Sequence, residues 1–295
     1  MPYLSPHSTM KPPLGARINP AHPFAQDMRL AILFNETYAA VGAAKGLPLF
    51  ITAGPPATAW GPNLSGTATW VGNTDGAAFN LATSNFLTLN AGGTSALDPV
   101  PTSAVTLLYI RRKTDTTLRT AGHFGGALAA DLSSCGAHVP WVDGTVYWDF
   151  GGVVGAHRLS VAGLSFAATV ERWIFTAGPQ GSAIWRNGVK VASQATAITR
   201  STGTSAFYLN NGHVAGNAGD NQEINFFQIN GVQWSDALCQ WWSAEPYAHL
   251  YPRPMTYVGS SKGKGKLPAS VVSATAAASA AASGTGPLLT TVGIG

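Results

Sequence analysis

Charged side chains are scarce in this chain. Asp, Glu, Lys and Arg account for 10% of its 295 residues, against about 25% in an average soluble domain. Lys262, Lys264 and Lys266 belong to a stretch without acidic residues, and removing them from the 17 basic residues leaves 14 against 13 acidic ones. The rest of the chain is nearly neutral and carries no basic stripe interleaved with aromatics, so we expect no nucleic-acid partner. Such a surface is typical of subunits inside a larger assembly.

Cysteine and long apolar runs are equally rare. Cys135 and Cys239 are the two cysteines, and without a CxxC spacing or companion histidines they match no zinc motif. They are either two buried free thiols or one disulfide, and the sequence leaves both open. No run of about 18 apolar residues occurs, so we expect no membrane span. The N-terminus lacks the apolar segment of a signal peptide, so we expect the protein to be made in a cytoplasm and released, if at all, by another route.

Paired carboxylates are also missing. The chain has four glutamates, and none has an acidic neighbour two or four positions later: Glu36, Glu171, Glu223 and Glu245. Asp143 and Asp149 would lie about 20 Å apart on one straight strand, whereas a retaining glycoside hydrolase needs about 5–5.5 Å. The seven histidines are scattered, and no nucleotide-binding fingerprint occurs. We therefore expect no enzymatic activity and no cofactor, with a hydrolase of unrecognised site as the remaining alternative.

What the chain does contain is β structure. Between Glu171 and Ser193 an alternating strand with Trp173 and Phe175 meets a Gly-Pro-Gln-Gly turn, a second strand, and then Asn187-Gly188. Asn-Gly between alternating runs is a strong hairpin signal, because both residues tolerate positive φ. Further strands are expected at Met28–Phe34, Thr67–Val71, Ala77–Leu81, Phe86–Leu89, Ala104–Arg111, Leu118–Phe124, Thr145–Phe150, Arg158–Val161, Ala206–Asn210 and Glu223–Ile229.

One helix and two arms complete this organisation. Ser235-Asp236 can cap a short helix over Ala237–Ser243, and its apolar positions Leu238, Trp241 and Trp242 should pack on the sandwich. Residues 1–18 form a proline-rich arm, 19–258 the globular domain and 259–295 a Gly/Ser/Ala-rich arm. That second arm ends in apolar residues suited to docking on a neighbouring subunit, with a disordered tail as the alternative: Leu288, Leu289, Val292 and Ile294.

The string W-x4-G-x2-G-x3-W-x-N-G-x2-V, which spans Trp173–Val191, resembles the central strands of laminin-G-like, concanavalin-A-like domains. The opening INPAHPFAQDMRLAILFNE and the segment DGTVYWDFG at Asp143–Gly151 resemble the versions found in tailed bacteriophages. This resemblance covers roughly residues 18–255. It implies an all-β fold, a two-sheet antiparallel β-sandwich of jelly-roll type with one short C-terminal helix and extended terminal arms.

The resemblance also implies a function. We expect a non-enzymatic virion structural protein of a tailed phage, such as a capsid decoration, head-fibre or tail-accessory subunit. It would bind other virion proteins through its arms and form a homo-oligomer such as a trimer, after synthesis in the host cytoplasm. The alternative is a carbohydrate-binding adhesin that recognises host surface polysaccharide. The fold itself hosts both roles.

Candidate site residues follow from strand alternation, from the expected loops and from the resemblance to laminin-G-like domains. Alternation puts Asp143, Tyr147 and Asp149 on one face of a strand, a wet surface on which a glycan could bind. Trp141 and Trp60 lie near expected loops and could stack on sugar rings, although a sandwich tryptophan is more often core, as we expect for Trp173 and Trp185. The resemblance leaves a rim Ca²⁺ site open, with oxygen ligands at Asp131, Asn211 and Asp220, or else these residues only form turns.

Overall fold

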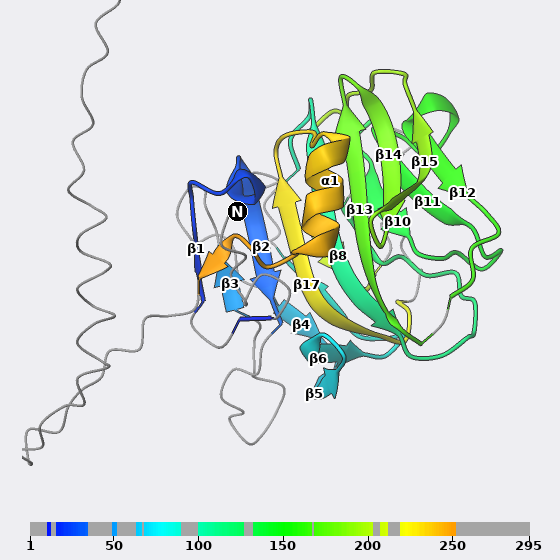
Figure 1. Ribbon diagram of the computed structural model, residues 1–295. Coiled ribbons are helices and arrows are strands. Elements are labelled where there is room, and N and C mark those ends of the chain that lie inside the picture. The colour runs from blue at the N-terminus through cyan, green and yellow to red at the C-terminus, as the bar shows by residue number, and fades with distance from the viewer. Residues whose placement is uncertain are drawn as a thin grey trace, which may run out of the picture. The chain divides into compact units, whose positions relative to one another are not determined.

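A computed structural model describes residues 11–12, 16–34, 49–51, 63–66, 68–89, 100–126, 132–166, 168–202, 207–211 and 219–251. This part of the chain folds into two antiparallel sheets that face each other, with one α-helix against the larger sheet (Figure 1). The expectation of an all-β, two-sheet sandwich with one short helix is therefore confirmed.

The larger sheet has nine strands. Its main path runs β15-β14-β13-β8-β17-β2-β3, and β6 pairs with both β17 and β5. Its strands are β2 (Met28–Leu33), β3 (Leu49–Ile51), β5 (Ala68–Asn73), β6 (Gly76–Leu81), β8 (Val105–Lys113), β13 (Val170–Gly178), β14 (Gly181–Arg186), β15 (Val189–Gln194) and β17 (Gln222–Asn230).

The smaller sheet has seven strands in the order β12-β11-β10-β9-β16-β7-β4. They are β4 (Asn63–Ser65), β7 (Phe86–Thr88), β9 (Phe124–Gly126), β10 (Cys135–His138), β11 (Val146–Phe150), β12 (Arg158–Val161) and β16 (Phe207–Leu209). A separate two-stranded sheet joins β1 (Arg17–Ile18) to β18 (Leu250–Tyr251).

The strands β13, β14 and β15 are the three consecutive strands expected around Asn187-Gly188. Asn187 has φ of 50° and Gly188 of 84°, the positive pair that a type I′ turn requires. Trp173 lies opposite Arg186 across β13 and β14, and Ile174 lies opposite Trp185. The hairpin prediction is confirmed, as is the core position of Trp173 and Trp185, which are buried.

Side chains from both sheets fill the space between them. Phe124 of the smaller sheet lies near the ring of Phe175 of the larger one, with centroids 5.3 Å apart at 71°. Trp148 adds a polar link, because its Nε1 donates a hydrogen bond of 3.0 Å to the Thr176 carbonyl across the interface. Aromatic pairs in this offset or edge-on geometry add to the stability gained by burial.

The outer face of the larger sheet is also covered. The helix α1 (Asp236–Ala244) lies across it (Figure 1), together with the 3-10 turn η1 (Pro23–Ala25) and the β1–β18 pair. Burial on both faces explains why β8 carries the continuous apolar run Leu107–Ile110 instead of an alternating pattern. A second 3-10 turn, η3 (Gly155–His157), precedes β12.

The helix begins as its cap predicts, with Ser235 Oγ accepting a hydrogen bond from the amide of Leu238 at 3.4 Å. Trp242 is buried as expected, but Trp241 is 40% exposed. Cys239 takes the buried place on that face instead. Both cysteines are buried, each in a different cluster of the core, and no disulfide joins them, so the interpretation as two buried thiols is confirmed.

The strand expected over Leu118–Phe124 is wrong apart from its last residue. Arg119 in this segment bonds to Asp115 and Asp220, and His123 lies 3.3 Å from the same Asp220 carboxylate. Side-chain contacts thus help to fix this segment, and its end is also held by backbone hydrogen bonds from the His123 amide to the Ala137 carbonyl and from the Asn210 amide to the His123 carbonyl. The first expected arm is also partly packed, because β1 pairs with β18 and Lys11 Nζ donates to the carbonyls of Phe34 and Ala77.

The second expected arm, including Leu288, Leu289, Val292 and Ile294, lies outside the described residues. Among the residues that the structure does describe, no helix is both long enough and apolar enough to cross a membrane.

Candidate functional site

The outer face of β10, β11 and β12 gathers most of the residues predicted to bind a glycan. Tyr147 lies opposite His138 on β10, and Asp149 lies opposite Arg158 on β12. Directly opposed residues of antiparallel strands share a face, and so do residues two apart on one strand. Tyr147 and Asp149 are therefore on the same face, as alternation predicted.

Rings cluster at the end of this face. Trp141 lies edge-on to His138, with ring centroids 4.3 Å apart, and His138 lies 6.2 Å from the Tyr147 ring. Two backbone hydrogen bonds of 2.9 Å close the turn that holds Trp141. The Trp141 amide donates to the Thr145 carbonyl, and the Gly144 amide donates to the Trp141 carbonyl. Gly144 has φ of 80°, which favours glycine there. Trp141 is half-buried, leaving part of its ring accessible.

Asp143 and Tyr147 form an exposed polar pair beside these rings. The Tyr147 hydroxyl donates to Asp143 Oδ2 at 2.7 Å, and the Thr145 amide donates to Oδ1 at 2.8 Å. Burial opposes ionisation of Asp143, but these hydrogen bonds together outweigh it and lower the pKa of the carboxyl. The same bond to the carboxylate raises the pKa of the Tyr147 hydroxyl. At neutral pH Asp143 is thus an ionised acceptor at the surface.

Asp149 is not a surface residue, which corrects its expected place on a wet face. Its side chain is 0% exposed, and both oxygens accept bonds of 2.7 Å from Arg158 Nε and Nη2. Burial raises the pKa of Asp149, opposed by Arg158. In turn the hydrogen bond to Asp149 raises the pKa of Arg158. The guanidinium lies over the Tyr147 ring, 4.7 Å from its centroid. Asp149 therefore positions Arg158, and Arg158 supports the ring.

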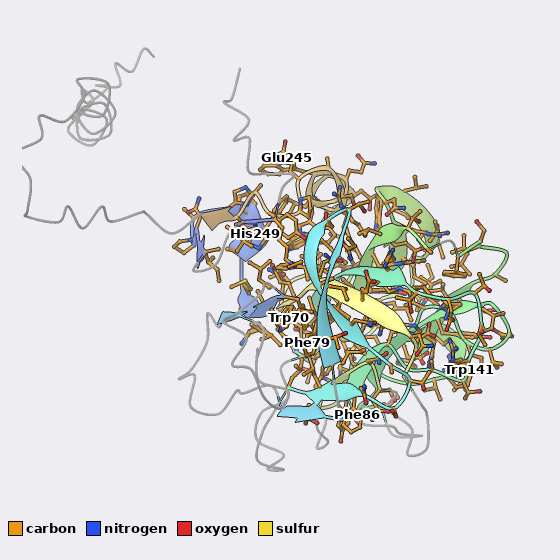
Figure 2. The ribbon with its side chains drawn as sticks, turned by 90° about the horizontal axis from the view of Figure 1, so that it is seen from below. Trp70, Phe79, Phe86, Trp141, Glu245 and His249 are labelled. Carbon is orange, nitrogen blue, oxygen red and sulfur yellow. The ribbon has the colours of Figure 1, made fainter. Side chains whose placement is uncertain are left out.

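We call Trp141, Asp143, Tyr147 and Arg158, with His138 and Asp149 beneath them, the Tyr147 face. Sequence reasoning missed His138 and Arg158, because each comes from a neighbouring strand. His138 is buried, its Nδ1 is 2.8 Å from the Ala121 carbonyl, and burial lowers its pKa. The imidazole is thus neutral, with Nδ1–H donating to that carbonyl. In Figure 2, Trp141 lies on the opposite side of the molecule from Glu245, which caps the end of α1, and from His249. The Tyr147 face is thus separate from the region around the end of the helix.

The predicted Ca²⁺ ligands do not come together as a set in the described residues. Asp131 and the stacking candidate Trp60 lie outside them, and Asn211 is half-buried just after β16. Within the described ranges, no group of three or more His, Cys, Asp or Glu side chains is arranged to hold a metal ion. Calcium binding stays a prediction.

Asp220 is held by cations of the protein itself. Lys113 Nζ donates to its Oδ1 at 2.6 Å and Arg119 Nη1 at 2.8 Å, and His123 Nε2 lies 3.3 Å from Oδ2. Burial alone would raise the pKa of Asp220, but the hydrogen bonds from His123 and Lys113 and the charge of Arg111 hold it well below its ordinary value. This buried network explains the charge of Asp220 without a metal ion.

Comparisons with known proteins give a likeness of fold. No family model matches the chain, and no curated protein sequence matches it. Domain 4 of AbnA, a GH43 extracellular arabinanase from Geobacillus stearothermophilus solved with arabinotriose, is 11% identical, with a TM-score of 0.49 over 73% of this chain and 98% of that one.

The binding domain of Botulinum neurotoxin DC is 10% identical with a TM-score of 0.50, in complexes with rat synaptotagmin II and with SialylT. The match covers 74% of this chain and 51% or 50% of those, so this chain spans about half their length. None of these three structures is described as a virion protein, and the virion role and the homo-oligomer stay predictions. The comparisons thus agree with the sheets of Figure 1 that the chain is a β-sandwich.

Proposed function

We propose that this chain is a carbohydrate-binding domain that holds a glycan against the Tyr147 face. The observation that carries the proposal is the meeting of two accessible rings, Trp141 and Tyr147, with an ionised carboxylate and a guanidinium on one surface. A sugar offers apolar C–H faces to aromatic rings, and its hydroxyls both donate and accept hydrogen bonds. Sites of this kind combine apolar contact with a few well-placed polar groups.

The polar groups of the face are already oriented for such a ligand. Asp143 keeps lone pairs free after accepting its two bonds, since a carboxylate has about four acceptor sites. Arg158 uses Nε and Nη2 for Asp149, which leaves Nη1 to donate to a ligand oxygen. The Tyr147 ring is fixed between Arg158 and the Asp143 bond. A pre-oriented face loses less side-chain entropy on binding.

The structural neighbours support this proposal at the level of fold. A neurotoxin binding domain with a TM-score of 0.50 to this chain was solved with SialylT. Sandwiches of this fold therefore include binding domains, although fold alone does not assign a ligand.

We take the domain to be non-catalytic. Asp149, one of the two carboxyls on this face, has both oxygens bound by Arg158, so a free carboxyl pair for glycoside hydrolysis is missing at the Tyr147 face. The hypothesis of a phage structural subunit is compatible with glycan binding. It rests on the sequence resemblance and on an arm outside the described residues, and it stays a prediction.

A glycan array tests the proposal. We expect saturable binding that is lost in Tyr147→Ala and in Trp141→Ala. The matched control is Tyr208→Ala, which removes a half-buried tyrosine from β16 of the same sheet and should leave binding intact. Binding unchanged in both face variants, or equal loss in the control, would refute the assignment to the Tyr147 face.

A further inference from the structure

A cavity of about 230 Å³ lies at the larger sheet beside the start of α1. Its walls come from β13, β14 and β15 and from the segment Gln233–Asp236 that leads into the helix. It shares no residue with the Tyr147 face. Its lining is mostly uncharged and polar, and includes three side-chain amides, Gln180, Gln194 and Gln233.

The charges at this cavity cancel. Lys190 and Asp236 are its two ionisable lining residues, and they form an ion pair with each other. Lys190 Nζ also lies 5.2 Å from the centre of the Trp185 ring. A charged ligand would have to displace this pairing, whereas a neutral ligand with hydroxyls would not.

Trp234 supplies an unused hydrogen-bond donor. The residue lines the cavity and is 3% exposed, and its Nε1 has no hydrogen-bond partner among the described residues. Its backbone amide bonds to Thr106 Oγ1 at 2.9 Å, and its ring stacks on Phe24 with centroids 5.2 Å apart, so the indole is held in place. A buried N–H without an acceptor is destabilising, and a ligand oxygen would satisfy it where a small movement of the lining admits one.

The Gly-Pro-Gln-Gly turn shapes the wall of this cavity. Gln233 Oε1 accepts a hydrogen bond of 2.9 Å from the backbone amide of Gln180, and Gln233 Nε2 donates one of 2.9 Å to the Gly181 carbonyl. A Cβ at Gly178 would lie 2.9 Å from Gln233 Oε1, and one at Gly181 would lie 1.9 Å from the Gln194 carbonyl oxygen. The two glycines therefore permit the close approach of both glutamines, a role beyond turn formation.

From these features we infer that the cavity binds a neutral, hydroxyl-rich ligand of about one sugar ring, independently of the Tyr147 face. Hydroxyl groups both donate and accept, which matches a lining of amides, hydroxyls and an indole N–H. Pockets for drug-sized ligands measure about 300–1,000 Å³, so this smaller cavity fits a monosaccharide or a chain terminus better than an oligosaccharide.

The test follows the indole N–H resonances of the ¹⁵N-labelled full chain during titration with D-glucose, D-galactose or L-arabinose. Trp234→Phe identifies the Trp234 resonance by its loss. We expect at least one sugar to shift that resonance saturably with a Kd of about 1 mM, a typical weak affinity of about −4 kcal/mol. No shift of that resonance with any of the three sugars would overturn the inference.

A pair of variants, one that fills the cavity and one that does not, tests where the sugar binds. Ala195 lines the cavity and Ala197 does not, and both alanines are exposed on the same segment. Ala195→Trp should abolish the shift and Ala197→Trp should retain it, with unchanged dispersion of the other indole resonances as the check on folding. An equal shift in Ala195→Trp would overturn the site. Tyr147→Ala should keep the shift, and its loss there would contradict an independent cavity, whatever the glycan array shows.

Discussion

Replacing Arg158 by methionine tests how the Tyr147 face is built. The substitution keeps an unbranched side chain of similar length over the Tyr147 ring but removes the guanidinium. Asp149 then keeps a carboxylate that is 0% exposed and has lost two bonds of 2.7 Å. The variant should therefore be less stable than the native protein and should also lose binding of any glycan that uses Arg158.

The size of the loss follows from burial. Removing one partner of a fully buried ion pair costs about 3–5 kcal/mol. The Arg158 side chain is 31% exposed, so water will reach the vacated space and solvate the carboxylate in part. Allowing for that screening, we expect Arg158→Met to lower the free energy of unfolding by about 2–3 kcal/mol near neutral pH.

Urea unfolding followed by tryptophan fluorescence measures this change. Burial already raises the pKa of Asp149 in the native protein, and loss of Arg158 removes the group that opposes this rise. A carboxyl with a higher pKa in the folded than in the unfolded state gains a proton on folding, so its penalty disappears as the pH falls through the raised pKa. The deficit should therefore be full at about pH 8 and smaller at about pH 5.

Two controls make this reasoning refutable. Arg29→Met breaks an exposed pair with Asp27, whose side chains are 44% and 39% exposed, and should cost at most about 1 kcal/mol. The double variant Asp149→Asn/Arg158→Met leaves no buried charge at position 149 and should recover stability relative to Arg158→Met. A single variant as stable as the native protein, or a double variant no more stable than the single one, would show that the pair does not act as argued.

Two further predictions concern buried titratable groups. Burial, with a smaller effect of His22, lowers the pKa of His249 to about 3. The unfolded chain therefore binds a proton at this histidine more readily than the folded one. The free energy of unfolding should keep its full contribution from neutral His249 above about pH 6.5 and fall by up to about 1.4 kcal/mol per pH unit toward pH 3. Urea unfolding of His249→Gln should show a shallower pH dependence, and an unchanged slope would contradict this. Burial raises the pKa of Cys239 to about 12, and Cys135 is also buried, so neither thiol should react with a maleimide dye until urea unfolds the chain; prompt labelling of the native protein would be the contrary result.

Local signals explain what the sequence could predict of the fold. Asn187-Gly188 and the Ser235 cap act within a few residues of chain, and both elements form where expected. The strand Cys135–His138 was not expected, because CGAH shows no clear alternation. It exists because β9 and β11 pair with it on either side. Non-local pairing of this kind is set by the assembled sheet and not by propensity.

The same limit applies to the candidate site. Alternation along β11 placed Tyr147 and Asp149 together, but it gave no information about the register of β12. Arg158 is fixed opposite Asp149 by that register, which turns a supposed surface acid into a buried one. The cavity beside α1 has the same origin, since Gln233 and the Gly181 carbonyl meet across 52 positions of the chain. A turn motif alone does not predict the wall it forms.

The pairing of β1 with β18 determines how the β-sandwich responds to a pulling force applied through its ends. Arg17 lies opposite Tyr251 and Ile18 opposite Leu250, so the two ends of this antiparallel pair leave on the same side. A tension between the preceding and following parts of the chain would peel the pair open one hydrogen bond at a time instead of shearing all of them together. The pair would thus open at low force before β2 or α1 carries any load.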